Sequence, residues 1–162
     1  PAGDGGDVGG RQALRHMGEH CRLWGEDQVF ETFTKVHKKL KDEFFLNPKK
    51  QPDDPYEGNH ISAMVANGSG IYGVYAHREV IAFDRFWCNG SGRAYALGAM
   101  HALWAERSAT QPGQTPDALA IARAGLAAGM EFDRASGGEM RLWRFVTGEQ
   151  GGPELIDSTI SA

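Results

Sequence analysis

The sequence predicts an α+β protein in which helices are stacked on a largely antiparallel sheet. Helical and strand patterns run in blocks, in the order helix, helix, three strands, helix, helix, strand. The three central strand patterns are short and are separated by turn residues, which is typical of a β-meander. We expect a single domain over residues 1–148, followed by a flexible or docked tail over residues 149–162.

Composition limits the function classes that the chain can belong to. Apolar residues make up 41% of its 162 residues, the net charge is −4, and no apolar run approaches the roughly 18 residues of a membrane span. The basic cluster Lys35–Lys41 alternates with apolar residues, which indicates a solvated helix face rather than a nucleic-acid surface. Cys21 and Cys88 lie far apart without neighbouring cysteines, so we expect the reducing cytoplasm.

Two helices are expected before the strands. A glycine-rich loop leads into a first helix over Gln12–Leu23, and Gly25 is a plausible stop. From Asp27 to about Leu46, apolar residues recur at steps of three and four, which predicts a long amphipathic helix; they are Val29, Phe33, Val36, Leu40 and Phe44. The prolines that follow, Pro48, Pro52 and Pro55, cannot continue a helix.

Three short strands are predicted next. Ile61–Val65 and Ile71–Tyr75 flank the turn Asn67–Gly70, and Val80–Phe83 supplies a third apolar run. This segment therefore predicts a meander of three strands.

Two helices and a strand follow the meander. The turn Asn89–Gly92 opens an Ala-rich helix that runs to about Glu106. A second helix is predicted with Thr115 as N-cap, Pro116 at its first position and Asp117 in its first turn, ending near Gly129. A last strand is expected over Met140–Val146, so the sheet has few strands for two helix pairs to cover.

Two motifs give the chain a family resemblance. Asn89–Gly98, with Gly-Ser-Gly followed by Tyr-Ala, is similar to the segment that opens a helix in proteasome β-type subunits. Asp133–Gly138 resembles the Asp-x-x-Ser-Gly-Gly that precedes the last strand of those subunits, and the helix over Phe30–Asn47 resembles the proteobacterial, HslV-like branch. The resemblance covers roughly Gly6–Phe145 and depends on both motifs occurring in the right order.

The resemblance implies a fold and an activity. The fold would be the N-terminal nucleophile (Ntn) hydrolase sandwich of α/β/β/α layers, in which helix pairs flank antiparallel sheets, with the N-terminal strands missing from this chain. The activity would be that of a threonine-type peptidase of stacked homo-oligomeric rings, which degrades unfolded polypeptides and works with an ATP-dependent unfoldase.

The resemblance also assigns roles to residues. Ser91 would hydrogen-bond near the α-amine of the catalytic threonine, Asp133 and Ser136 would orient and polarise that nucleophile, and the backbone N–H of Gly6 would bind the oxyanion. Pro1 has no hydroxyl group, so we expect the threonine to be absent and the chain as given to be inactive.

A cation site is implied as well. Related bacterial subunits bind a monovalent cation through backbone carbonyls at positions that correspond to Gly129, Phe132 and Ala135, and the last two differ from the side chains usual there. No other cofactor is expected.

Several alternatives remain open from the sequence. Residues 90–92 could be only a strand-to-helix turn, and Asp133 and Ser136 only a loop that ends a helix. The fold could persist in a non-catalytic ring subunit. His16, Glu19 and His20 form an H-x-x-E-H pattern, in which two imidazoles bind zinc and the carboxylate activates water, so a zinc hydrolase is a further alternative.

Overall fold

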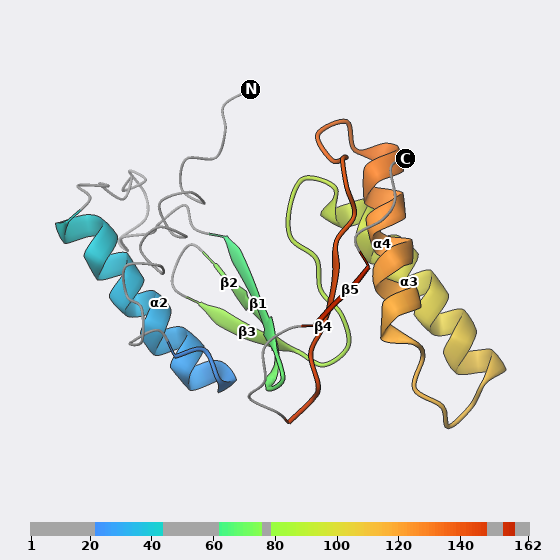
Figure 1. Ribbon diagram of the computed structural model, residues 1–162, viewed down its shortest axis with the longest axis horizontal. Helices are drawn as coiled ribbons and strands as arrows, with labels where there is room; N and C mark the ends of the chain where they lie inside the picture. Colours follow the sequence, from blue (N-terminus) through green and yellow to red (C-terminus); the bar gives the residue numbers. More distant parts are fainter. Residues whose placement is uncertain (1–21, 44–61, 76–78, 149–153, 158–162) are drawn as a thin grey trace, which may run out of the picture. The chain divides into compact units, whose positions relative to one another are not determined.

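The chain is an α+β protein whose described elements are three helices, a three-stranded sheet and a two-stranded ribbon (Figure 1). The computed structural model describes residues 22–43, 62–75, 79–148 and 154–157. It divides into two compact units, which are considered separately: a first unit of Pro1–Arg85 with Val146–Gly151, and a second unit of Phe86–Phe145 with Gly152–Ala162. The first predicted helix, over Gln12–Leu23, lies almost entirely outside the described residues.

Helix α2 of the first unit spans Gly25–Asp42 and presents one apolar stripe. Glu26 and Asp27 lie in its first turn and Lys39 and Lys41 in its last, which suits the helix dipole at both ends. The helix ends four residues before the predicted Leu46, with Glu43 as its C-cap. Consecutive acidic residues, Asp42 and Glu43, are unfavourable at a helix C-terminus, and this weighs against further extension.

The predicted meander is confirmed. Strands β1 (Ala63–Asn67), β2 (Gly70–Val74) and β3 (Val80–Phe83) pair antiparallel in sequence order. The pairing of Asn67 with Gly70 closes the β1–β2 hairpin with a two-residue turn. Gly70 has φ of +151°, and a Cβ at this position would lie 3.0 Å from the Tyr72 hydroxyl, so the turn requires glycine there.

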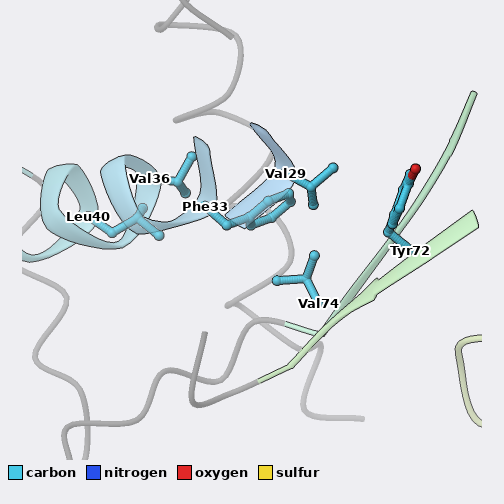
Figure 2. Close-up of a cluster of buried hydrophobic side chains, with 6 residues drawn as sticks. All are labelled: Val29, Phe33, Val36, Leu40, Tyr72 and Val74. Carbon is cyan, nitrogen blue, oxygen red and sulfur yellow. The ribbon is translucent and has the colours of Figure 1, made fainter. Parts of the chain in front are cut away.

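The core of the first unit lies between α2 and one face of this sheet. Tyr72 and Val74 of β2 cluster with the apolar stripe of α2, namely Val29, Phe33, Val36 and Leu40. Figure 2 shows the side chain of Val74 pointing from the sheet toward Phe33 and Val29 of α2. Burial of each such side chain contributes about 1.5–3 kcal/mol, so this cluster is what holds the helix on the sheet.

The β1–β2 turn also closes the start of α2. Its N-cap residue, Trp24, makes no side-chain cap hydrogen bond. Instead, the backbone N–H of Gly25 donates to Ser69 Oγ at 2.9 Å, and Asn67 Nδ2 donates to the Leu23 carbonyl at 2.6 Å. Ser69 Oγ in turn donates to Asn67 Oδ1 at 2.6 Å, which holds the serine in place. A side chain of the turn therefore caps the first N–H of the helix, which the side chain of Trp24 does not do.

The second unit is built on an antiparallel helix pair, α3 (Arg93–Thr110) and α4 (Ala118–Phe132). The predicted N-cap of α4 is wrong: Asp117 occupies that position, and its side chain accepts from the Leu119 N–H at 3.0 Å. Pro116 therefore precedes the cap instead of opening the helix. The carboxylate of Asp117 is a better acceptor than the Thr115 hydroxyl for the free N–H groups of the first helical turn. The N-cap therefore lies at Asp117, two residues after the predicted Thr115.

A short ribbon completes the second unit. Strand β4 spans only Leu142–Arg144, shorter than the predicted Met140–Val146, and it pairs antiparallel with β5, Glu154–Asp157. Strand β5 lies in the segment that was expected to be a flexible or docked tail, and its four residues are strand. Nowhere in the described ranges is there a helix with the length and apolarity that a membrane crossing requires.

Candidate functional site

Small residues on α3 and α4 allow the two helices to pack closely. Ala96 and Met100 of α3 are buried with Ile121 of α4, and Gly125 and Gly129 continue the α4 side at four-residue steps. A Cβ on Gly125 would lie 2.7 Å from Met100 Cγ, and one on Gly129 would lie 4.0 Å from Ala96 Cβ. The helices therefore approach each other through positions that lack side chains, and the start of α3 lies beside the end of α4 (Figure 1).

This packing brings together the two motifs that were recognised in the sequence. Ser91, directly before α3, donates its hydroxyl hydrogen to Asp133 Oδ2 at 2.5 Å across 42 residues of sequence. Ser136 Oγ donates to the same oxygen at 2.6 Å. Asp133 is the C-cap of α4, and its carbonyl accepts from the Ser136 N–H at 3.0 Å, so a tight turn fixes both residues. We call Ser91, Asp133 and Ser136 the hydroxyl–carboxylate cluster.

The cluster is arranged to hold a negative charge. The hydroxyl of Ser136, followed by that of Ser91, lowers the pKa of Asp133 below its ordinary value, because both donate to the charged form. Desolvation of the carboxyl group opposes this shift, and the backbone N–H of Ala135 makes a lesser contribution that lowers the pKa. Asp133 is therefore a carboxylate at neutral pH.

The direction of these hydrogen bonds limits the chemistry. Both serine hydroxyls donate their hydrogen to the carboxylate. Toward any other group they can therefore act only as hydrogen-bond acceptors. A carboxylate with a lowered pKa is also a weak general base, which makes it poorly suited to activate Ser91 as a nucleophile. The cluster is better suited to accept hydrogen bonds from a positively charged donor such as an ammonium group.

The structure thus unites three of the four predicted catalytic residues. The fourth, Gly6, lies outside the described residues, as do His16, Glu19 and His20 of the zinc pattern. Within the described ranges no group of three or more His, Cys, Asp and Glu residues could hold a metal ion.

The residues predicted to bind a cation lie beside the cluster. The carbonyl of Gly129 accepts the Asp133 N–H at 3.0 Å, which ends the helix. Phe132 is 65% exposed, and its ring lies 5.7 Å from that of Tyr95. Ala135 is exposed in the turn that follows. Cation binding through these carbonyls stays a prediction.

The sequence reasoning missed the glycines that make the site possible. Gly125 was given no role, and Gly129 was considered as a helix end and for its carbonyl, yet both lie where α3 and α4 approach each other. The available signal was their four-residue spacing in an Ala-rich helix, opposite Ala96 and Met100 at the same spacing.

Cys88, in contrast, carries no chemistry in this arrangement. Its half-buried thiol packs against the Ala96 and Met100 cluster, and burial raises its pKa. A thiol with a raised pKa is a poor nucleophile at neutral pH.

Two solved structures are similar to this chain. Thiobacillus denitrificans BPH is 34% identical with a TM-score of 0.55. Thiobacillus denitrificans BPH in complex with epoxomicin is 33% identical, also with a TM-score of 0.55. In each case the similarity covers 72% of this chain and 56% of the other, so this chain spans little more than half the length of the solved proteins. No family model matches the chain, and neither does any curated protein.

Proposed function

We propose that this chain is part of a proteasome β-type peptidase subunit with the Ntn-hydrolase fold. The observation that carries the proposal is the hydroxyl–carboxylate cluster, in which Ser91 and Ser136 donate to one oxygen of Asp133. These are the three described residues to which the family resemblance assigns supporting catalytic roles, and they meet although two separate motifs supply them. The α+β arrangement and the similarity to BPH are compatible with this assignment.

The cluster would act on an N-terminal threonine. That residue's neutral α-amine would donate an N–H to the acceptor lone pairs of Ser91, and the negative charge of Asp133 would stabilise the ammonium group that forms once the amine has taken the hydroxyl proton. In the reaction, the threonine hydroxyl oxygen bonds to the peptide carbonyl carbon, and the α-amine takes the hydroxyl proton and passes it to the leaving amine as the C–N bond breaks. The backbone N–H of Gly6 would stabilise the oxyanion. Water then releases the acyl group.

The threonine itself is, in this proposal, supplied by a part of the subunit that this chain does not include. The helical Thr32 is unsuited to the role, because it is buried and its Oγ1 donates to the Arg22 carbonyl. The complete subunit would assemble with identical copies in stacked rings in the cytoplasm and receive unfolded polypeptide from an ATP-dependent unfoldase. Because BPH forms a complex with epoxomicin, we expect the complete subunit to bind it too.

The test compares Asp133→Asn with Glu131→Gln in the complete subunit. Both replace a carboxylate by an amide at the end of α4, but only Asp133 accepts from Ser91 and Ser136. We expect kcat for a fluorogenic peptide to fall about 10²-fold in Asp133→Asn, because the attacking group is misplaced, and to change less than about twofold in Glu131→Gln. Intact mass after incubation with epoxomicin should show one inhibitor molecule on each active subunit.

Other results would contradict the proposal. A folded complete subunit that neither cleaves peptides nor binds epoxomicin would favour the non-catalytic ring subunit. Stoichiometric zinc, with peptidase activity that chelation abolishes, would favour the hydrolase based on His16, Glu19 and His20 instead.

A further inference from the structure

Gly92 lies at the closest approach between the start of α3 and the turn that carries Asp133. It is buried, it is the N-cap residue of α3, and its backbone has φ of −77° and ψ of 2°. Any amino acid can adopt these angles, so the backbone conformation does not require glycine. The requirement is one of space.

The space around Gly92 is filled by the cluster itself. A Cβ built on this residue would lie 3.0 Å from Ser136 Oγ, 3.3 Å from Asp133 Cβ and 3.3 Å from Gly129 Cα. Gly129 contributes a backbone atom of α4, and Ser136 Oγ is held by its hydrogen bond to Asp133. Asp133 Cβ and Gly129 Cα can move only with the backbone, and Ser136 Oγ can turn away only by weakening its hydrogen bond to Asp133. In the same helix, Gly98 has no neighbour within 4 Å of such a Cβ.

We propose that Gly92 is a positioning residue: its missing side chain lets Ser91 and Ser136 reach the same carboxylate oxygen of Asp133. A methyl group at this position would push Ser136 Oγ away by a few tenths of an ångström or separate the start of α3 from the turn. Either movement lengthens one of the two hydroxyl–carboxylate bonds, which are 2.5 and 2.6 Å long. The expected loss of catalysis rests on the proposed function, whereas the expected lengthening of a hydrogen bond to Asp133 does not.

The experiment compares Gly92→Ala with Gly98→Ala in the complete subunit, using two measurements. Crystal structures should show a longer distance from Asp133 Oδ2 to Ser91 Oγ or Ser136 Oγ in Gly92→Ala than in the wild type, because the added methyl group occupies the space beside Ser136 Oγ. For peptide hydrolysis, kcat should fall about tenfold with KM nearly unchanged, since the nucleophile is misplaced and substrate contacts are not. Gly98→Ala should match the wild type in both measurements.

A double-mutant cycle tests whether the effect acts through Ser136. In Ser136→Ala the oxygen that the new methyl group would meet is gone, so adding Gly92→Ala should lower kcat and lengthen the Ser91 Oγ to Asp133 Oδ2 distance by clearly less than it does in the wild type. If Gly92→Ala alone does not fold, a folded double variant would support the same crowding. If the double variant also fails to fold, contact with Ser136 is not the cause and the proposal is rejected.

The remaining outcomes separate the two proposals. A folded Gly92→Ala variant in which Ser91 Oγ and Ser136 Oγ both keep their wild-type distances to Asp133 Oδ2 would overturn the positioning role, even if activity fell. If the wild-type subunit has no peptidase activity but Gly92→Ala still lengthens one of the two hydroxyl–carboxylate hydrogen bonds, the positioning role holds and the proposed function fails.

Discussion

The two compact units attach their helices by opposite means. In the first unit, α2 is held on the sheet by large side chains that fill the space between them; Val29, Val36 and Val74 are the most deeply buried. In the second unit, α3 and α4 approach through Gly125 and Gly129, where side chains are missing. Where large side chains fill the space, removing atoms leaves a cavity and destabilises the fold. Where two helices pack through glycines, adding atoms crowds the interface and destabilises it.

The hydrogen-bond networks of the two units also differ, because their side chains have different partners. In the first unit, Asn67 donates to the Leu23 carbonyl and accepts from Ser69, so its partners close a turn against a helix start. In the second unit, Ser91 and Ser136 both donate to the charged Asp133. The first network pairs its groups with the backbone and stabilises the fold. The second concentrates a charge and acceptor groups at one place, which is what a binding or catalytic site needs.

The strongest test of this comparison removes atoms from the first unit. Phe33→Ala should lower the free energy of unfolding by about 3–5 kcal/mol, because Phe33 is 4% exposed in the α2–sheet core and its loss leaves a cavity. Phe30 of the same helix is 49% exposed and serves as the control, with an expected loss below about 1 kcal/mol. Urea unfolding measures both. Equal losses would mean that α2 is not held by this stripe.

The next test adds one carbon atom to the second unit. Gly125→Ala should destabilise by about 1–3 kcal/mol, since its Cβ would lie 2.7 Å from Met100 Cγ. Gly98→Ala, with open space around it, should be neutral or should stabilise by up to about 1 kcal/mol because alanine favours the helix. Thermal unfolding of the pair gives the difference. A stabilised Gly125→Ala would contradict packing by missing side chains.

The smallest expected effect concerns the charge on Asp133. Its pKa is lower in the folded protein than in the unfolded chain, where about 3.9 is usual, so its ionised form stabilises the fold. This contribution is complete above pH of about 4 and is lost as the pH falls through the lower folded value. The stability difference between wild type and Asp133→Asn in urea should therefore shrink in acid. Ser136→Ala, which removes one donor, should have an intermediate pH dependence.

Much of the fold could be predicted from local patterns. The alternating strands and their turn residues gave the meander, and the apolar stripe gave most of α2. The boundaries were less predictable because they depend on competing end groups. Thr115 and Asp117 are both residue types that cap helices well. Asp117 is the N-cap because its side chain accepts from the Leu119 N–H in the folded chain. The β5 strand was missed because Glu154–Asp157 has little strand character without its partner β4.

The sequence by itself determined the chemical identities at the site: two serines and one aspartate in two recognisable motifs. It also determined the helix and strand patterns around them, because periodicity and turn chemistry are local properties. Tertiary structure decided that Ser91 meets Asp133 across 42 residues and that Ser136 donates to the same oxygen. It also decided why glycine is needed at positions 92 and 125. Those facts depend on how closely two helices approach, a distance that no single segment of the chain specifies.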